Sequence, residues 1–294
     1  MNKNKRKPDW FKIELKATEN SKRVKKTVSG FFLHSVCEEA KCPNRNECWG
    51  KYKTASFLAL GPVCTRNCAF CSVVTGKPGP VDLEEPLRIA NSAKELSLSH
   101  LVVTMSTRDD LLDGGAGLMA EIIRLNKKEN PNCTIEILSS DMGGSVNSID
   151  LMMAEGPQVM SHNLETVRRL SPKIRPQADY DRSLFFLRKA AEYDSSIIKS
   201  SVLVGLGETL AELEEAMKDL LNAGVNIINI GQYLQPTKTN AAVERYLKIE
   251  EFKELKQKAL NMGFLYCESG PLVRSSYHAG LQYEKIIKLA GNSL

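Results

Sequence analysis

Stretches with the pattern of β-strands alternate with stretches patterned as α-helices along most of this 294-residue chain. Short apolar, β-branched runs predict strands at Ala55–Leu60, His100–Met105, Thr134–Leu138, Pro157–Ser161, Ile197–Val204, Val225–Ile230 and Phe264–Cys267. Apolar residues at helical spacing predict helices at Asp82–Leu96, Gly117–Glu129, Ser148–Glu155, Tyr180–Tyr193, Thr209–Asn222 and Glu250–Met262. This alternation predicts an α/β fold with a parallel sheet, and the number of units favours a complete or partial TIM-like (β/α) barrel.

In a (β/α) barrel the reactive groups lie at the carboxyl ends of the strands. In this chain those ends are followed by Cys64, Cys68, Cys71, Ser106, Asp141, His162, Asn163, Gly205, Gly207 and Gln232. We therefore expect the functional site at this edge of the sheet.

Six of the eight cysteines lie within 35 residues and form two triplets. The first triplet has the spacing C-x4-C-x5-C and consists of Cys37, Cys42 and Cys48. The second has the spacing C-x3-C-x2-C and consists of Cys64, Cys68 and Cys71. No secretion signal is evident, so we expect a cytoplasmic protein whose dense cysteines stay reduced and bind metal.

The arrangement in threes favours iron–sulfur clusters over zinc. A structural zinc ion needs four ligands, so one zinc site would leave two of the six triplet cysteines unused. Two iron–sulfur clusters, each held by three thiolates with one iron left open, use all six. Cys133 and Cys267 lie in or beside apolar strand patterns, and we interpret them as ordinary buried thiols.

Positive charge is concentrated at the N-terminus. Residues 1–26 contain ten Lys/Arg and three Asp/Glu, a net charge of +7, while the remaining residues sum to −2. The segment is either a solvated, frayed tail or a patch that steers an acidic partner. Nucleic acid is disfavoured because Trp10 and Phe11 are its only aromatic residues. The longest uncharged run, Leu220–Thr237, contains Asn, Gln and Pro, so no membrane span is expected.

Several motifs resemble those of a known enzyme family. The run C-T-R-N-C-A-F-C (Cys64–Cys71) resembles the cluster-binding loop of radical S-adenosylmethionine (SAM) enzymes. Six other runs resemble those of lipoyl synthases: C-E-E-A-K-C-P-N-R-N-E-C-W (Cys37–Trp49), R-D-D-L-L-D-G-G-A (Arg108–Ala116), S-H-N-L-E-T-V (Ser161–Val167), V-G-L-G-E-T (Val204–Thr209), G-Q-Y-L-Q-P (Gly231–Pro236) and R-S-S-Y-H-A (Arg274–Ala279). The likeness extends in order over nearly the whole chain, from about residue 30 to residue 283.

The resemblance implies two 4Fe–4S clusters and SAM as cofactors. The cluster of the second triplet would cleave SAM, and the radical formed would abstract hydrogen at C6 and C8 of an octanoyl chain. The first triplet, with a serine of the Arg274–Tyr277 run, would bind an auxiliary cluster that donates two sulfur atoms. The spacing leaves Ser275 and Ser276 both open as this ligand, and we expect Ser276. The implied partners are an octanoylated lipoyl-carrier domain (2-oxoacid dehydrogenase E2 or glycine cleavage H protein) and an electron donor such as ferredoxin or flavodoxin.

The resemblance also implies a set of residues near SAM: Phe70, Thr104, Ser106, Asn163, Gly205, Gly207 and Glu208. His162 fits either a substrate or cofactor contact or a capped helix start. The chain departs from the family at Thr107, where an acidic residue is usual, and at Ser140, where a proline commonly precedes the aspartate. Neither departure involves an expected cluster ligand.

The motifs divide the chain into three expected parts. These are a basic N-terminal extension with the first triplet (1–53), a radical SAM barrel (54–268) and a C-terminal extension with the R-S-S-Y run (269–294). Two other functions fit parts of the pattern. One is a different radical SAM sulfur transferase, of the biotin synthase or thiolation type. The other is a non-enzymatic zinc-binding module that uses the basic tail to bind nucleic acid.

Overall fold

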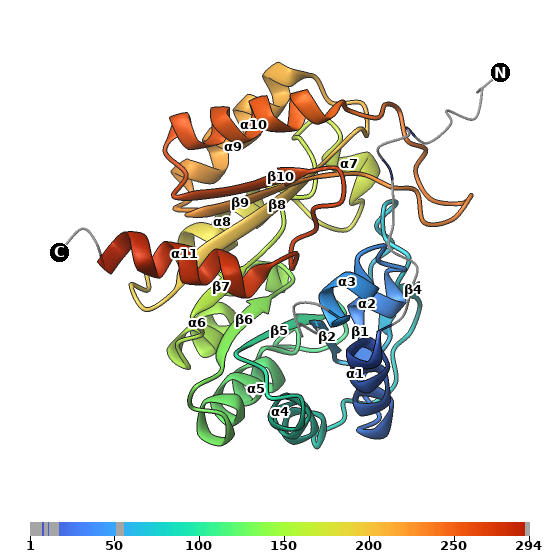
Figure 1. Cartoon of the computed structure of the whole chain (residues 1–294), viewed down its shortest axis with the longest axis vertical. Helices are drawn as coiled ribbons and strands as arrows, with labels where there is room; N and C mark the ends of the chain where they lie inside the picture. The colour runs from blue at the N-terminus through green and yellow to red at the C-terminus, as the bar shows by residue number, and fades with distance from the viewer. Residues whose placement is uncertain (1–7, 9–10, 12–17, 51–55, 292–294) are drawn as a thin grey trace.

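A computed structural model describes Pro8, Phe11 and residues 18–50 and 56–291 of the chain (Figure 1). Its main sheet has eight strands in the order β1-β2-β5-β6-β7-β8-β9-β10. β1 (His34–Ser35) is antiparallel to β2, and all later neighbours are parallel. The parallel strands are β2 (Ser56–Ala59), β5 (His100–Met105), β6 (Thr134–Leu138), β7 (Val159–Ser161), β8 (Ile197–Val204), β9 (Ile227–Gln232) and β10 (Tyr266–Gly270).

The parallel strands follow the sequence pattern. Each of the seven predicted strands is present, and three of them have the predicted ends. Their order in the sheet is their order in the chain, and within the described residues the edge strands β1 and β10 do not pair with each other. The sheet is therefore an open, partial barrel of successive βα units. Ala55, the predicted start of the first of these strands, lies outside the described residues.

Six helices connect the parallel strands where the apolar periodicity predicts them. They are α4 (Glu85–Glu95), α5 (Ala116–Glu129), α6 (Val146–Ala154), α8 (Tyr180–Ala190), α9 (Leu210–Asn222) and α10 (Ile249–Met262). Side-chain oxygens of Ser145, Asp179 and Thr209 accept backbone N–H groups and so fix where α6, α8 and α9 begin. Gly263, in the left-handed region at φ 116°, ends α10.

The N-terminal segment is more ordered than a frayed tail. Residues 19–26, expected to be part of a solvated end, belong to α1 (Glu19–Gly30), which the sequence analysis missed. Val24 and Val28 are the two apolar residues of this helix. They are four positions apart, so they lie on the same face, and both are buried in the core. The frayed-tail interpretation is therefore wrong for this stretch. Most of the rest of the basic segment, including Trp10, lies outside the described residues.

Short elements hold the two cysteine triplets. Cys37 is in α2 (Val36–Glu39) and Cys48 is in α3 (Arg45–Gly50). Cys64 ends β3 (Val63–Cys64), which pairs with β4 (Val74–Thr75) in a separate two-stranded sheet. These elements, like α7 (Ser171–Ile174), are too short to show an apolar periodicity in the sequence.

The C-terminal helix α11 (Ala279–Gly291) begins close to α3, where Tyr277 Oη donates to the Glu47 carboxylate at 3.4 Å, and runs toward the left in Figure 1. Its Tyr283 ring stacks on His100 at the start of β5, with ring centroids 6.0 Å apart. Behind His100, Lys199 Nζ and Glu136 Oε1 form a buried ion pair at 2.9 Å. α11 thus covers the amino ends of the strands, and the carboxyl ends stay available for a site. No helix in the described part of the chain is long and apolar enough to span a membrane.

Candidate functional site

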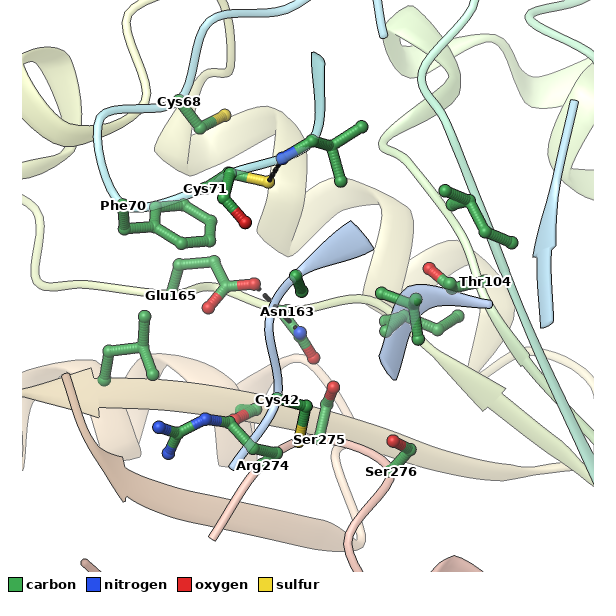
Figure 2. Close-up of a pocket in the computed structure, with 18 of the residues that line it drawn as sticks. Cys42, Cys68, Phe70, Cys71, Thr104, Asn163, Glu165, Arg274, Ser275 and Ser276 are labelled. Carbon is green, nitrogen blue, oxygen red and sulfur yellow. Dashed lines mark hydrogen bonds between the residues drawn. The ribbon is translucent and has the colours of Figure 1, made fainter. Parts of the chain in front are cut away.

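A cavity of about 520 Å³ lies at the carboxyl ends of the strands (Figure 2). Its wall contains members of both cysteine triplets: Cys37, Cys42, Cys64, Cys68 and Cys71. This volume lies within the range of sites for small molecules and cofactors. The structure therefore brings the two groups of thiols, separate in the sequence, to one enclosed space.

The loop of the second triplet is fixed by a buried arginine. Arg66, between Cys64 and Cys68, is 6% exposed and donates two hydrogen bonds to the Asp109 carboxylate, of 2.8 and 2.7 Å. It also donates to Asp141 Oδ1 at 2.6 Å, and Arg182 donates to the other oxygen of Asp141 at 2.9 Å. The loop is thereby attached to the segments that follow β5 and β6.

Backbone and amide hydrogen bonds hold the remainder of this loop. Ala69 N–H donates to the Ile174 carbonyl at 2.8 Å, and Asn240 Nδ2 donates to the Cys71 carbonyl at 2.7 Å. Ser72 Oγ donates to the Glu39 carbonyl at 2.7 Å, which joins the loop to the end of α2. The position of the second triplet is thus defined from several sides before any ligand binds.

We expect Asp141→Asn to destabilise the folded protein. Burial would raise the Asp141 pKa, but the Arg66 hydrogen bond and nearby positive charge hold it well below its usual range. Without this carboxylate, Arg66 loses one of its two negatively charged partners. Removing one partner of a buried ion pair lowers the free energy of unfolding by about 3–5 kcal/mol. We expect the lower end of this range because Asp109 still contacts Arg66. Denaturant unfolding at neutral pH measures the loss.

The pH dependence provides the control for this variant. A depressed carboxyl pKa contributes stability above the unfolded value of about 3.9, and the contribution is lost as the pH falls through the folded value. The difference between wild type and Asp141→Asn should therefore be full at pH 7 and shrink in strong acid. Asp110→Asn, which removes a more exposed partner of Arg108, is a matched control expected to cost less. Equal stability of Asp141→Asn and wild type at pH 7 would contradict this assignment.

The first triplet is joined to the C-terminal segment. Cys42 N–H donates to the Cys37 carbonyl at 3.0 Å, so these two residues close one turn after α2. Asn44 Nδ2 then donates to the Leu272 carbonyl at 2.5 Å. Cys48 is not part of the cavity wall, but it lies close enough to Cys37 and Cys42 for their repulsion to add to burial in raising its pKa.

Strand β9 holds the serines of the R-S-S-Y run near the same cavity. Asn229 Nδ2 donates to the carbonyls of Arg274 and Ser275, at 3.0 and 2.8 Å. Ser275 and Ser276 both contribute to the cavity wall, on the side of Cys42 (Figure 2). In the described part of the chain, neither serine hydroxyl makes a hydrogen bond to another residue. Both are therefore available to a ligand.

Burial raises the pKa values of five of the six triplet thiols. Burial, with repulsion from Cys42, raises the pKa of Cys37 to about 11, and burial raises those of Cys71 to about 11 and Cys68 to about 12. Binding of iron to these thiols would therefore release protons. Within residues 18–50 and 56–291, no three Cys, His, Asp or Glu side chains converge as a single-ion site does. A cluster spreads its irons over separate corners, so its ligands need not meet at one point.

Four of the seven residues expected near SAM are in the cavity wall: Phe70, Thr104, Ser106 and Asn163. Ser106 Oγ donates to the Gly61 carbonyl at 2.7 Å, so its hydroxyl already serves the loop. Asn163 Nδ2 donates to Glu165 Oε1 at 2.9 Å, whereas its buried Oδ1 has no partner among the described residues. A buried unpaired acceptor of this kind fits a site that is completed by a ligand.

The glycine turn after β8 is not part of the cavity wall. Gly205 and Gly207 have positive φ angles of 95° and 105°. A Cβ on Gly205 would lie 2.2 Å from Gln232 Nε2, so the close approach explains this glycine. Glu208 accepts hydrogen bonds from Gly205 N–H and Leu206 N–H and stabilises the turn. The cavity wall reaches only as far as Leu203 on this strand.

Four further polar residues belong to the wall: His162, Glu165, Arg175 and Arg274. The sequence analysis singled out His162 but not the other three. Burial lowers the His162 pKa to about 4, so this ring is neutral at pH 7. Glu165 lies two residues after Asn163 in S-H-N-L-E-T, and Arg274 opens the R-S-S-Y run, so both motifs contained a signal. Arg175 had none, because its place depends on the packing of α7.

Comparisons with known proteins agree with these motifs. A family model of the Radical SAM superfamily matches residues 58–232, and one of the N-terminal domain of lipoyl synthase matches residues 1–42. The lipoyl synthase of Geobacillus kaustophilus (strain HTA426) is 52% identical over 284 residues, which cover 96% of this chain and 95% of that protein. The chain belongs to the lipoyl synthase family. The lipoyl synthase of Bacillus subtilis (strain 168) is 51% identical over 284 residues, with 96% and 95% covered.

Two solved structures share the fold at low sequence identity. Methylornithine synthase superimposes with a TM-score of 0.56 and 15% identity over 68% of this chain and 60% of that chain. HydG, a maturase of the [FeFe]-hydrogenase, gives a TM-score of 0.57 and 17% identity over 78% and 53%. The predicted partial barrel of the radical SAM type is therefore confirmed.

Membership in the lipoyl synthase family also confirms the predicted enzyme class, a radical SAM sulfurtransferase. Radical SAM enzymes use a 4Fe–4S cluster, SAM and a reductant, and lipoyl synthases act on lipoyl-carrier proteins. The zinc module and the biotin synthase or thiolation enzyme do not account for the match over nearly the full chain.

Proposed function

We propose that this chain inserts two sulfur atoms, at C6 and C8, into an octanoyl group amide-linked to a lysine of a lipoyl-carrier domain. The observation that carries the proposal is the single cavity that contains thiols of both triplets together with Ser275 and Ser276. A reaction that first removes hydrogen and then adds sulfur at the same carbon needs both groups next to one substrate chain.

The second triplet is proposed to hold the cluster that binds SAM. When bound, the cluster and SAM supply a carbon-centred radical able to take hydrogen from an unactivated alkyl carbon, which acid–base groups cannot do. Asn163 offers its unpaired Oδ1 and lies between Phe70 and Thr104 in the view of Figure 2, and all three line the cavity. Arg175, near Cys68, offers a positive charge for a carboxylate such as that of SAM.

The turn after β8 has a different proposed role. Gly205, Gly207 and Glu208 form a backbone surface just beyond the cavity wall, and we assign this surface to the adenosine end of SAM. Ser106 is assigned to the methionine end, through the loop that it fixes to Gly61.

The first triplet and Ser276 are proposed to hold the auxiliary cluster that donates sulfur. The Asn44–Leu272 hydrogen bond supports this assignment, because it brings the cysteine loop and the serine loop together. A serine oxygen is a harder ligand than a thiolate and can leave iron as the cluster gives up its sulfur.

The other part of the catalytic environment is apolar. Leu58, Val102, Leu138 and Leu203 line the cavity and leave little room for water, which protects a reactive radical from side reactions. An octanoyl chain is itself apolar, so the same residues favour its burial.

Several partners and boundaries follow from this proposal. The carrier domain is an E2 subunit or an H protein, and the electron donor is a ferredoxin or flavodoxin. The cytoplasm suits the enzyme because the six triplet thiols must stay reduced to ligate iron. The chain is then divided into the first-triplet extension (1–53), the barrel (54–268) and the R-S-S-Y extension (269–294).

Mass spectrometry of an octanoyl-lysine carrier peptide tests the function directly. The anaerobically reconstituted full-length enzyme is incubated with dithionite, SAM and the peptide. We expect a product that has lost two hydrogens and gained two sulfur atoms, with 5′-deoxyadenosine formed in parallel. An unmodified peptide, despite cleavage of SAM by the same sample, would contradict the proposal.

A further inference from the structure

Arg274 carries a positive charge that no carboxylate in the described structure neutralises at contact distance. Its Nη1 donates only to backbone carbonyls, of Val273 at 2.6 Å and Gln232 at 3.2 Å. The side chain lines the cavity, and burial lowers its pKa. Arg274 is half-buried, and a guanidinium that lines a cavity without a contacting carboxylate favours an anion in the cavity beside it.

The groups that face Arg274 indicate which anion this is. Its electrostatic neighbours are the Cys42 thiol and Glu165. Figure 2 shows Arg274 beside Cys42 and Ser275, with Cys68, Phe70 and Cys71 on the far side of Glu165. Arg274 therefore belongs to the first-triplet end of the cavity.

Arg175 has the corresponding position at the second-triplet end. It is 5% exposed, and its Nη1 donates to the Leu164 carbonyl at 2.9 Å and to Ser183 Oγ at 3.2 Å. Its charge acts on Cys68 and on Glu165. Each thiol group thus has its own guanidinium, buried at Arg175 and half-buried at Arg274, and the Glu165 carboxylate interacts with both.

We propose that Arg274 is a positioning residue whose fixed positive charge stabilises the auxiliary cluster in its ligated, anionic form. This inference rests on the proposed function, since it requires a cluster at the first triplet. Three thiolates and a serine oxygen outweigh the charge of an oxidised cluster core, so the ligated cluster is an anion. Net charge and hydrogen bonds near a cluster set its reduction potential, and a nearby cation makes the addition of an electron easier.

The test uses the full-length chain with Cys64, Cys68 and Cys71 changed to Ala, which leaves only the first triplet to hold a cluster. In this parent we compare Arg274→Gln, which removes the charge, with Arg274→Lys, which keeps it on a different shape. Arg175→Gln is the matched control, because it removes a buried guanidinium at the other end of the cavity. The measurements are the reduction potential by film voltammetry and the rate of iron loss to a chelator, with circular dichroism to verify folding.

We expect Arg274→Gln to shift the potential to more negative values and to lose iron about tenfold faster, as for the loss of one charge-assisted interaction. Arg274→Lys should retain most of the parent potential, and Arg175→Gln should match the parent in both measurements. A parent-like potential and iron-loss rate in Arg274→Gln would overturn the proposal, as would an Arg274→Lys variant shifted as far as Arg274→Gln. A parent that binds no cluster at all would instead refute the proposed function on which this inference rests.

Discussion

Replacing Cys64, Cys68 and Cys71 together by Ala should reduce cleavage of SAM to background while leaving a second cluster in place. These three residues are the cysteines of the C-T-R-N-C-A-F-C loop. Hydrogen bonds of Arg66 and Asn240 hold this loop at the cavity wall. Without them no iron is presented to SAM at this end of the cavity. 5′-Deoxyadenosine release, measured by liquid chromatography, and iron content, expected to fall by about half, report the two effects.

A cysteine control separates loss of ligands from loss of fold. Cys133 and Cys267 are buried, 6% and 0% exposed, and neither belongs to the cavity wall. Cys133→Ala and Cys267→Ala should therefore retain SAM cleavage, with at most a modest loss of stability from the smaller side chain. SAM cleavage at the wild-type rate by the triple variant would contradict the assignment of the second triplet.

Replacing Cys37, Cys42 and Cys48 together by Ala should uncouple the two halves of the reaction. The hydrogen bonds that hold the second-triplet loop do not involve these thiols. The one contact with the first-triplet segment, from Ser72 to the Glu39 carbonyl, uses the backbone and is kept in the variant. SAM cleavage should persist, so 5′-deoxyadenosine still forms, but no sulfur reaches the octanoyl chain. In the variant, 5′-deoxyadenosine should accumulate while the lipoyl product falls below detection, so the ratio of the first to the second should rise sharply.

Single serine variants refine this second experiment. Ser276→Ala should lose product because Ser276 is the proposed ligand. Ser275→Ala should retain more product, and it is a matched control because Ser275 lies on the same wall. Full lipoyl yield from the Cys37/Cys42/Cys48 variant would mean that the first triplet is structural only.

The parallel sheet could be predicted because short apolar, β-branched runs mark its strands, even where a charged residue such as Glu136 or Lys199 interrupts them, and each crossover helix has a regular period. α1 was missed because its lysines conceal the apolar spacing of Val24 and Val28. β3, β4 and α7 leave no such signal, since two to four residues cannot show a period.

The grouping of the cysteines into two triplets is visible in the sequence, since their spacing is local. The place of Arg175 is not: it is a charged residue that sequence patterns place at the surface, and only the folded chain puts it beside Cys68. The same holds for Asn229, which appears in the sequence as part of a buried strand but holds the serine loop by two hydrogen bonds.

The central claim, that sulfur bound in the protein's own clusters is donated to the substrate, is tested most directly by an isotope experiment. The full-length enzyme is reconstituted with iron and a heavy isotope of sulfide, freed of unbound sulfide, and incubated with SAM, reductant and an octanoylated carrier domain. We predict that both sulfur atoms of the lipoyl product are heavy and that product formation stops when each chain has used its own cluster. Product that contains sulfur of natural isotopic abundance would contradict the account.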